Sequence, residues 1–117
     1  MLPIEPIDIP LTYPVFTVLS VEPSTGERWF VFVEADANDC LPVFRTRELA
    51  ELYIEQSQEA NPLAALEVLS CTNAKEFEQV LTQLASTIDH VIWDAPLRPP
   101  YFKLVTVADL LEIVRRA

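Results

Sequence analysis

Residues 15–34 have the sequence VFTVLSVEPSTGERWFVFVE, in which two runs of β-branched and aromatic residues flank a polar segment. Val15–Val21 and Arg28–Glu34 each have the composition of a strand. The segment between them contains a proline and Gly26, the only glycine of the chain, and both are residues that turns use. These features predict an antiparallel β-hairpin.

Both faces of the second predicted strand are apolar. Side chains alternate across a strand, so Trp29, Val31 and Val33 are expected on one face. Phe30 and Phe32 are then expected on the other face. Helices or another subunit must cover each of these faces.

The rest of the chain alternates between strand and helix patterns. Further strands are predicted at 40–44, 65–71, 88–93 and 101–105, and helices at 46–58, 73–84 and 106–116. The helix starts carry capping residues, namely Thr46, Asn73 with Glu76, and Thr106 with Asp109. The side chains expected to face the core are Leu49, Leu52, Tyr53 and Ile54, then Phe77, Val80, Leu81 and Leu84, then Val107, Leu110, Leu111 and Val114.

This order predicts an α+β fold, a two-layer sandwich with a mixed sheet and elements in the order β-β-β-α-β-α-β-β-α. The hairpin must be antiparallel, whereas the later crossovers allow parallel pairing. A chain of 117 residues has the size of a single domain, 1–117. Prolines at positions 3, 6 and 10 predict that residues 1–12 form an extended arm.

The charge balance limits the class of partner. Eighteen acidic residues oppose eight basic ones, and the net charge of -10 disfavours nucleic acid and anionic membranes. No basic residue precedes Arg28 and no apolar run is long enough to span a bilayer, so a cytoplasmic protein is expected. A basic protein partner is compatible with this charge, which makes an acidic neutraliser of a basic protein one alternative function.

The sequence predicts no catalytic residues and no cofactor. Cys40 and Cys71 lack the spacing of a zinc site and are expected to be buried, reduced thiols. His90 is the only histidine, and the adjacent Asp89 points to the opposite face of the predicted strand. A dyad of Cys71 and His90 requires neighbouring strands, and the sequence offers neither a third group nor a glycine-bearing oxyanion loop.

Two further patterns concern metal and ligand binding. Asp36, Asn38 and Cys40 begin like a calcium loop, but Leu41 occupies the position of the turn glycine, so a polar turn and no metal site are predicted. The second alternative function is a small enzyme or metabolite-binding domain with acids at strand ends. Its ligand-binding candidates are Glu34, His90 and Asp94.

Residues 93–102, WDAPLRPPYF, form the main contact candidate. Prolines restrict this segment, and its aromatic, leucine and arginine side chains are types that anchor interfaces. Trp93 and Phe102 are predicted to be core residues. The protein-contact candidates are Pro96, Leu97, Arg98, Pro99 and Tyr101. The favoured function is a non-catalytic protein-interaction module that binds another protein or a second copy of itself as a homodimer.

Residues 41–56, LPVFRTRELAELYIEQ, carry a family resemblance. This segment resembles the SseB-like (enhanced serine sensitivity) N-terminal domain family, in which a strand similar to LPVF leads into a capped helix containing an alanine. The matching positions are Leu41, Pro42, Val43, Phe44, Arg47, Glu48, Leu49 and Ala50. The resemblance implies a small α+β module and no catalytic residue.

Overall fold

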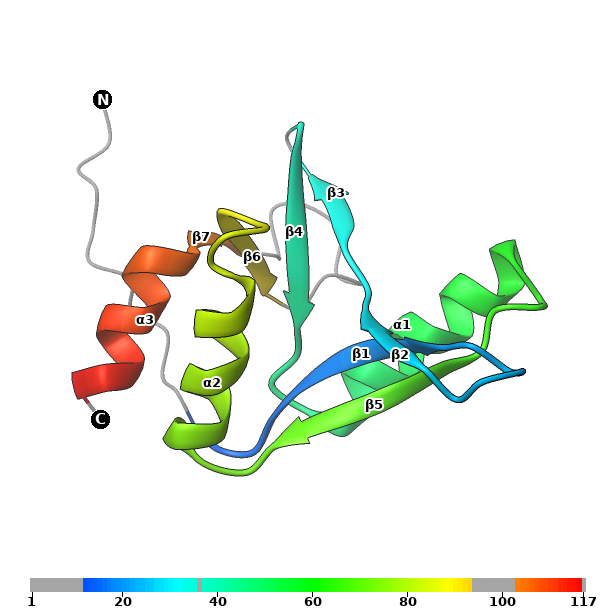
Figure 1. The fold of residues 1–117 in the computed structure, drawn as a ribbon, viewed down its shortest axis with the longest axis horizontal. Helices are drawn as coiled ribbons and strands as arrows, with labels where there is room; N and C mark the ends of the chain where they lie inside the picture. The colour runs from blue at the N-terminus through cyan, green and yellow to red at the C-terminus, as the bar shows by residue number, and fades with distance from the viewer. Residues whose placement is uncertain (1–11, 36, 94–102, 117) are drawn as a thin grey trace.

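The computed structural model describes residues 12–35, 37–93 and 103–116 (Figure 1). The α+β class is confirmed, and the elements follow the predicted order except that the second predicted strand is divided in two. The elements are β1 (Val15–Val21), β2 (Arg28–Phe30), β3 (Val33–Ala35), β4 (Asn38–Val43), α1 (Arg47–Ala60), β5 (Leu66–Cys71), α2 (Ala74–Leu84), β6 (His90–Trp93), β7 (Lys103–Thr106) and α3 (Val107–Arg116).

The described strands form two sheets. The first, sheet A, has the order β2-β1-β5, and both of its pairs are antiparallel. The second, sheet B, has the order β3-β4-β6-β7. In sheet B, β4 and β6 are parallel while β3 and β7 run antiparallel to their neighbours, which confirms the mixed pairing expected from the crossovers.

A few buried contacts join the two sheets where β1 crosses the end of β4. Phe16 and Phe44 exchange two backbone hydrogen bonds, with N···O distances of 2.9 and 2.7 Å. The hydroxyl of the buried Thr17 donates to the carbonyl oxygen of Pro42 at 2.7 Å. Backbone and side-chain hydrogen bonds therefore join the sheets here. The N–H groups of Phe16 and Phe44 and the hydroxyl of Thr17 all have acceptors, so none of them pays the penalty of an unsatisfied buried donor.

The helices cover different sheets, so the core has two parts. In Figure 1, α1 lies against sheet A, whereas α2 and α3 lie beside sheet B. The part under α1 consists of Phe16, Val18, Phe44 and Ala50 with the partly buried Val31, Leu49, Tyr53, Ile54, Leu66 and Val68. The larger part, under α2 and α3, includes Leu41, Val43, Val91, Trp93 and Val105 from strands and Phe77, Leu81, Leu84, Val107, Leu110, Leu111 and Val114 from helices.

The three predicted helix caps are present. Thr46, Asn73 and Thr106 accept hydrogen bonds at their side-chain oxygens from the backbone N–H groups three residues later. One detail of the prediction was wrong. The Glu76 carboxylate bonds the backbone N–H and the hydroxyl of Thr72 instead of reaching back to the capping residue.

Two further predictions were wrong, one about the buried face of α1 and one about the length of the second strand. Leu52 is 39 % exposed, and the small Ala50 is the fully buried residue of α1. The strand predicted at 28–34 is broken, because β2 ends at Phe30 after pairing with β1 and the chain then pairs with β4 from Val33. The apolar stripe of α1 and the alternation at 28–34 correctly indicated a helix and strands. Neither pattern specifies how many residues the neighbouring element covers.

The turn between β3 and β4 contains a strained residue. Ala37 has a φ of 62°, in the left-handed region that favours glycine. We expect Ala37→Gly to raise the free energy of unfolding by about 0.5–1 kcal/mol, because relief of the Cβ strain exceeds the added entropy of the unfolded chain. Urea denaturation measures this change.

Gly26 provides the reverse control. Its φ is 75°, and a Cβ added there would meet nothing within 4 Å. Gly26→Ala should therefore destabilise by a similar amount, about 1 kcal/mol, through backbone strain alone. A loss of stability in Ala37→Gly would show that the turn does not hold position 37 in the left-handed region.

Within the described part of the chain, no helix is long and apolar enough to cross a bilayer. The longest described helix, α1, has 14 residues.

Candidate functional site

Much of the predicted contact segment lies outside the described residues. This holds for Pro96, Leu97, Arg98, Pro99 and Tyr101, for Phe102 and for the ligand candidate Asp94. Trp93 ends β6 and is 3 % exposed, so its predicted place in the core is confirmed. The role proposed for positions 96–101 stays a prediction.

The two remaining ligand candidates do not come together. Glu34 pairs with Asp39 of β4, and His90 pairs with the neighbouring Cys40 on the other side of the same strand. Consecutive residues of β4 point to opposite faces, so the side chains of Glu34 and His90 also lie on opposite faces of sheet B. An acid-base pair of these two residues is not formed.

His90 lies beside a small polar hollow between the start of β4 and the loop before β6. The hollow has a volume of about 170 Å³, and its lining includes the titratable Asp39, Asp89 and His90. The Nδ1 atom of His90 is buried and has no hydrogen-bond partner among the described residues. A second hollow of about 360 Å³ adjoins it, and its lining includes Ile88, Val107 and Leu111.

Cys40 neighbours His90 across the β4–β6 pair and is buried, and the dyad of Cys71 and His90 is not formed. Cys71 ends β5 in sheet A, whereas His90 begins β6 in sheet B, so the neighbouring strands that a dyad requires do not exist. Burial, and secondarily the negative charge of Glu76, raise the pKa of the Cys71 thiol to about 11. The thiol is therefore protonated at neutral pH and inert as a nucleophile.

The residues that begin like a calcium loop were predicted to form a polar turn, and the described ones lie largely in β4. Asn38 and Cys40 are in β4, and Cys40 is buried, while Asp36 lies outside the described residues. In the portion of the chain that is described, no three His, Cys, Asp or Glu side chains are grouped closely enough to hold a metal ion.

The strongest feature of the surface is the segment of residues 28–35, which we call the 28–35 edge. It contains β2, the outermost strand of sheet A, and β3, the outermost strand of sheet B. Figure 1 shows β3 following β2 along the chain, with β4 beside β3. No described strand pairs with the outer side of either, so one continuous stretch of backbone forms the border of both sheets.

The hydrogen bonds to β1 show which groups of β2 face outward. Glu22 N–H donates to the Glu27 carbonyl at 2.8 Å, and Val31 N–H donates to the Val18 carbonyl at 3.2 Å. Bonded positions alternate in an antiparallel pair, so position 29 bonds β1. The N–H and C=O groups of positions 28 and 30 therefore point away from the sheet.

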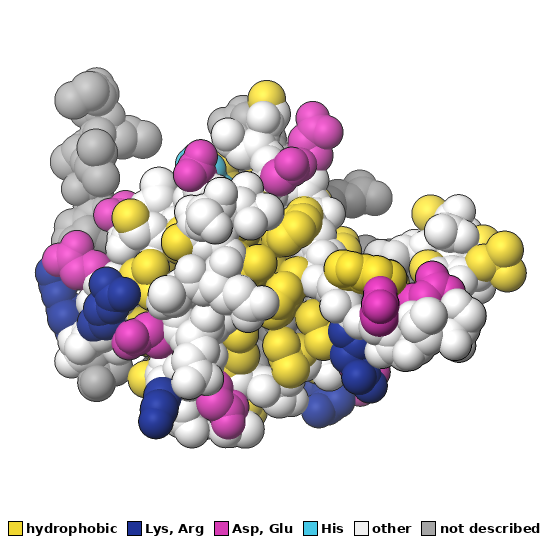
Figure 2. Space-filling view, in the orientation of Figure 1, with side chains coloured by type: hydrophobic (Ala, Val, Ile, Leu, Met, Phe, Trp, Pro, Cys, Tyr) yellow, Lys and Arg dark blue, Asp and Glu magenta, His cyan; other side chains and the backbone are white. Residues whose placement is uncertain are grey.

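Two large apolar side chains of the 28–35 edge are exposed. Trp29 is 50 % exposed and Phe32 is 38 % exposed, whereas Phe30 and Val31 between them pack against the two parts of the core. Figure 2 shows apolar side chains gathered in the middle of the face that carries β2, β4 and α2. Exposed aromatics beside an unpaired strand are typical of interaction surfaces.

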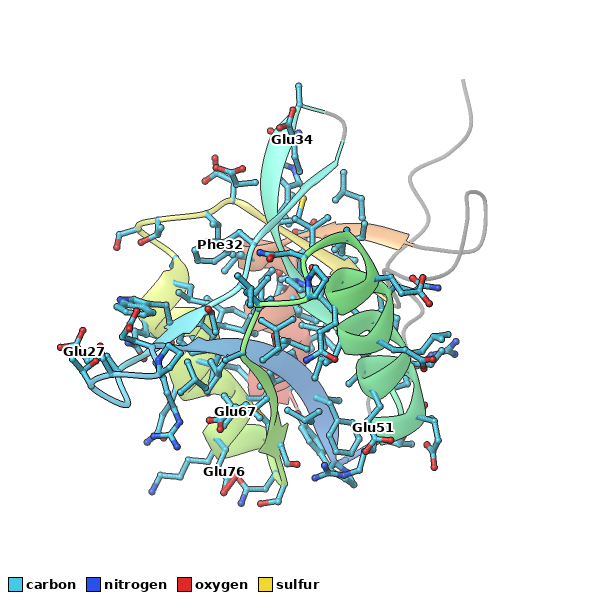
Figure 3. All side chains as sticks on the ribbon, turned by 90° about the vertical axis from the view of Figure 1, so that its right-hand side faces the viewer. Glu27, Phe32, Glu34, Glu51, Glu67 and Glu76 are labelled. Carbon is cyan, nitrogen blue, oxygen red and sulfur yellow. The ribbon has the colours of Figure 1, made fainter. Side chains whose placement is uncertain are left out.

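A glutamate lies at each end of this edge, Glu27 just before it and Glu34 near its last residue. Figure 3 shows Phe32 between Glu27 and Glu34, and both glutamates are exposed. Among the described residues neither glutamate forms an ion pair, whereas the Arg28 guanidinium is engaged by the carboxylate of Glu67. The uncompensated charge at both ends of the 28–35 edge is therefore negative.

Comparison with known proteins finds no protein family and no curated protein that matches this chain. The resemblance of residues 41–56 to the SseB-like N-terminal domain family thus stays a prediction. In the structure this segment is the buried end of β4 followed by α1, which Thr46 caps.

Sequence reasoning did not name the 28–35 edge among its contact candidates. It predicted that helices or another subunit must cover both apolar faces of this strand, and the described part of the chain leaves Trp29 and Phe32 exposed. The only signal was the run WFVFV at positions 29–33, which has more consecutive apolar residues than a strand with one solvated face normally contains.

Proposed function

We propose that this chain is a non-catalytic protein-interaction module and that the 28–35 edge is its contact surface. The observation that carries the proposal is a border of two sheets that exposes Trp29 and Phe32 and that no described strand pairs. Tryptophan and other aromatic residues often supply much of the binding energy of protein interfaces. The predicted contact residues at positions 96–101 are a second candidate surface.

The alternatives receive less support. The predicted acid-base role would use Glu34 with His90, and these side chains lie on opposite faces of sheet B. A dyad would use Cys71 with His90, which are in different sheets. Neutralisation of a basic protein by the whole surface would require acids gathered on one face. In the face that Figure 2 shows, Asp and Glu are spread around the periphery with Lys and Arg among them.

The test is a double substitution, Trp29→Ser with Phe32→Ser, in the full chain used as bait for proteins of the cells that make it. Loss of two exposed anchors should lower the amount of captured partner at least tenfold, the equivalent of about 1.4 kcal/mol. Because both side chains are partly exposed, the free energy of unfolding should fall by less than about 3 kcal/mol. Quantitative mass spectrometry and urea denaturation measure the two effects.

Leu63→Ser is the matched control. Leu63 is an apolar residue that is 91 % exposed and lies in the loop before β5, outside the 28–35 edge. This variant should capture the same proteins as the unmodified chain. Equal capture by the double variant and by Leu63→Ser would contradict the proposed contact surface.

A further inference from the structure

We infer that the occupant of the 28–35 edge is an extended segment of another protein that carries a basic residue near each end and joins the sheets as an added strand. This inference rests on the proposed function and specifies the chemistry of the partner. It follows from the backbone, the apolar side chains and the charges of the edge, taken in turn.

The backbone of the edge has the geometry that strand addition requires. Positions 28 and 30 direct their N–H and C=O groups outward, because positions 27 and 31 on either side bond β1 or its turn. An added strand would satisfy these groups with main-chain hydrogen bonds, the interaction that provides affinity in β-augmentation. Since β3 continues the border in sheet B, the added segment can extend beyond the three residues of β2.

The side chains of the edge favour an apolar middle in the partner. Trp29 and Phe32 are both exposed and lie near the centre of the segment. An extended partner places alternate side chains on each face, so β-branched or other apolar residues would cover the two rings. The contact therefore combines backbone pairing with burial of aromatic surface.

The charges specify the ends of the partner. Glu27 and Glu34 are seven positions apart, which corresponds to about 23 Å in an extended chain. Arg28 does not offset them, since its guanidinium is already paired with Glu67. Lys or Arg residues about seven positions apart in the partner would complement both carboxylates.

A second copy of the chain is a less suitable occupant. Each copy has a net charge of -10 and carries the same two unpaired glutamates at this edge. Pairing two such edges would bring negative surfaces together, and this costs free energy where like charges approach. The charge complementarity therefore favours a basic segment of a different protein.

The experiment compares three synthetic peptides with the full chain. The first is Lys-Val-Thr-Val-Thr-Val-Thr-Lys, the second has Glu at both ends, and the third has the basic sequence with N-methyl groups on alternate backbone amides. Titration is followed by calorimetry and by tryptophan emission in the full chain and in a Trp93→Phe variant, so that the change can be assigned to Trp29. We expect the basic peptide to bind at least tenfold more tightly than the acidic one and at least tenfold more tightly than the N-methylated one.

A variant pair tests the role of the two glutamates. Glu27→Gln with Glu34→Gln should remove most of the preference for the basic ends, whereas Glu51→Gln with Glu55→Gln on α1 should keep it. Equal affinity for the acidic and basic peptides, undiminished binding of the N-methylated peptide, or no binding of any peptide would overturn the inference. So would a dimer that dissociates on the Trp29→Ser and Phe32→Ser substitutions in sedimentation experiments.

The two proposals fail in different ways. If the peptides show no preference but the Trp29 and Phe32 substitutions still abolish capture of cellular proteins, the edge is a contact surface and the inferred chemistry of its partner is wrong. If capture is unaffected by those substitutions, the proposed function itself is wrong.

Discussion

Phe44→Ala should lower the free energy of unfolding by about 4 kcal/mol, the largest effect that we expect from one substitution. The Phe44 side chain is fully buried, and its ring lies 5.4 Å from that of Tyr53 on α1. Its backbone exchanges two hydrogen bonds with Phe16 where the two sheets meet. Truncation would leave a cavity at the place that joins sheet A to sheet B.

Phe32→Ala is the control for this prediction, because it removes the same atoms from a side chain that is 38 % exposed. It should cost less than about 1.5 kcal/mol, since the truncated ring is already partly solvated. Urea unfolding of both variants measures the difference. Equal losses in the two variants would show that the junction of the sheets contributes no more than the surface does.

Alkaline pH should destabilise the fold by about 3 kcal/mol through Cys71, since its pKa rises from the ordinary 9.0 to about 11. Below pH 9 the thiol is protonated in both the folded and the unfolded state, so its burial does not lower the free energy of unfolding there. Between pH 9 and 11 the thiol ionises in the unfolded state but stays largely protonated in the folded state. The free energy of unfolding therefore falls as the pH rises. Burial also raises the pKa of Tyr13 and Tyr53, which adds to the effect in the same direction.

Urea unfolding at intervals from pH 8 to pH 11 tests this linkage. Cys71→Ala removes the titrating thiol, so the stability of this variant should fall much less over the same range. A thiol reagent at pH 8 should correspondingly label Cys71 in the folded chain far more slowly than in the unfolded chain. Identical pH profiles for the two proteins would mean that the thiol ionises as easily in the folded state.

The helices could be predicted because their signals are local. Thr46, Asn73 and Thr106 are each followed by an apolar stripe at intervals of three and four residues. A capping side chain needs only the backbone N–H three positions on, so this geometry is contained in the segment itself. Leu52 departs from the prediction because it does not join the core cluster under α1, and such packing depends on residues distant in sequence.

The division of the strand at 28–35 could not be predicted from its alternation. β2 and β3 have the same pattern, and what separates them is their partners, β1 for one and β4 for the other. These pairings join residues that are distant in sequence. A pattern of period two indicates a strand but does not specify the sheet to which it belongs.

The candidate site depends on the same long-range pairing. Trp29 and Phe32 are exposed because the helices pack against other parts of the two sheets, and the sequence pattern left open whether helices or another subunit would cover them. The separation of Cys71 from His90 likewise follows from the assignment of β5 and β6 to different sheets.

Amide hydrogen exchange of the 28–35 edge, with and without the basic peptide, tests the central claim most directly. Positions 28 and 30 point outward while position 29 bonds β1, so adjacent residues serve as their own controls. We predict that saturating peptide slows exchange at Arg28 and Phe30 at least tenfold and changes Trp29 much less. Exchange at Phe30 that is as fast in the presence of the bound peptide as in its absence would contradict the claim that this edge accepts an added strand.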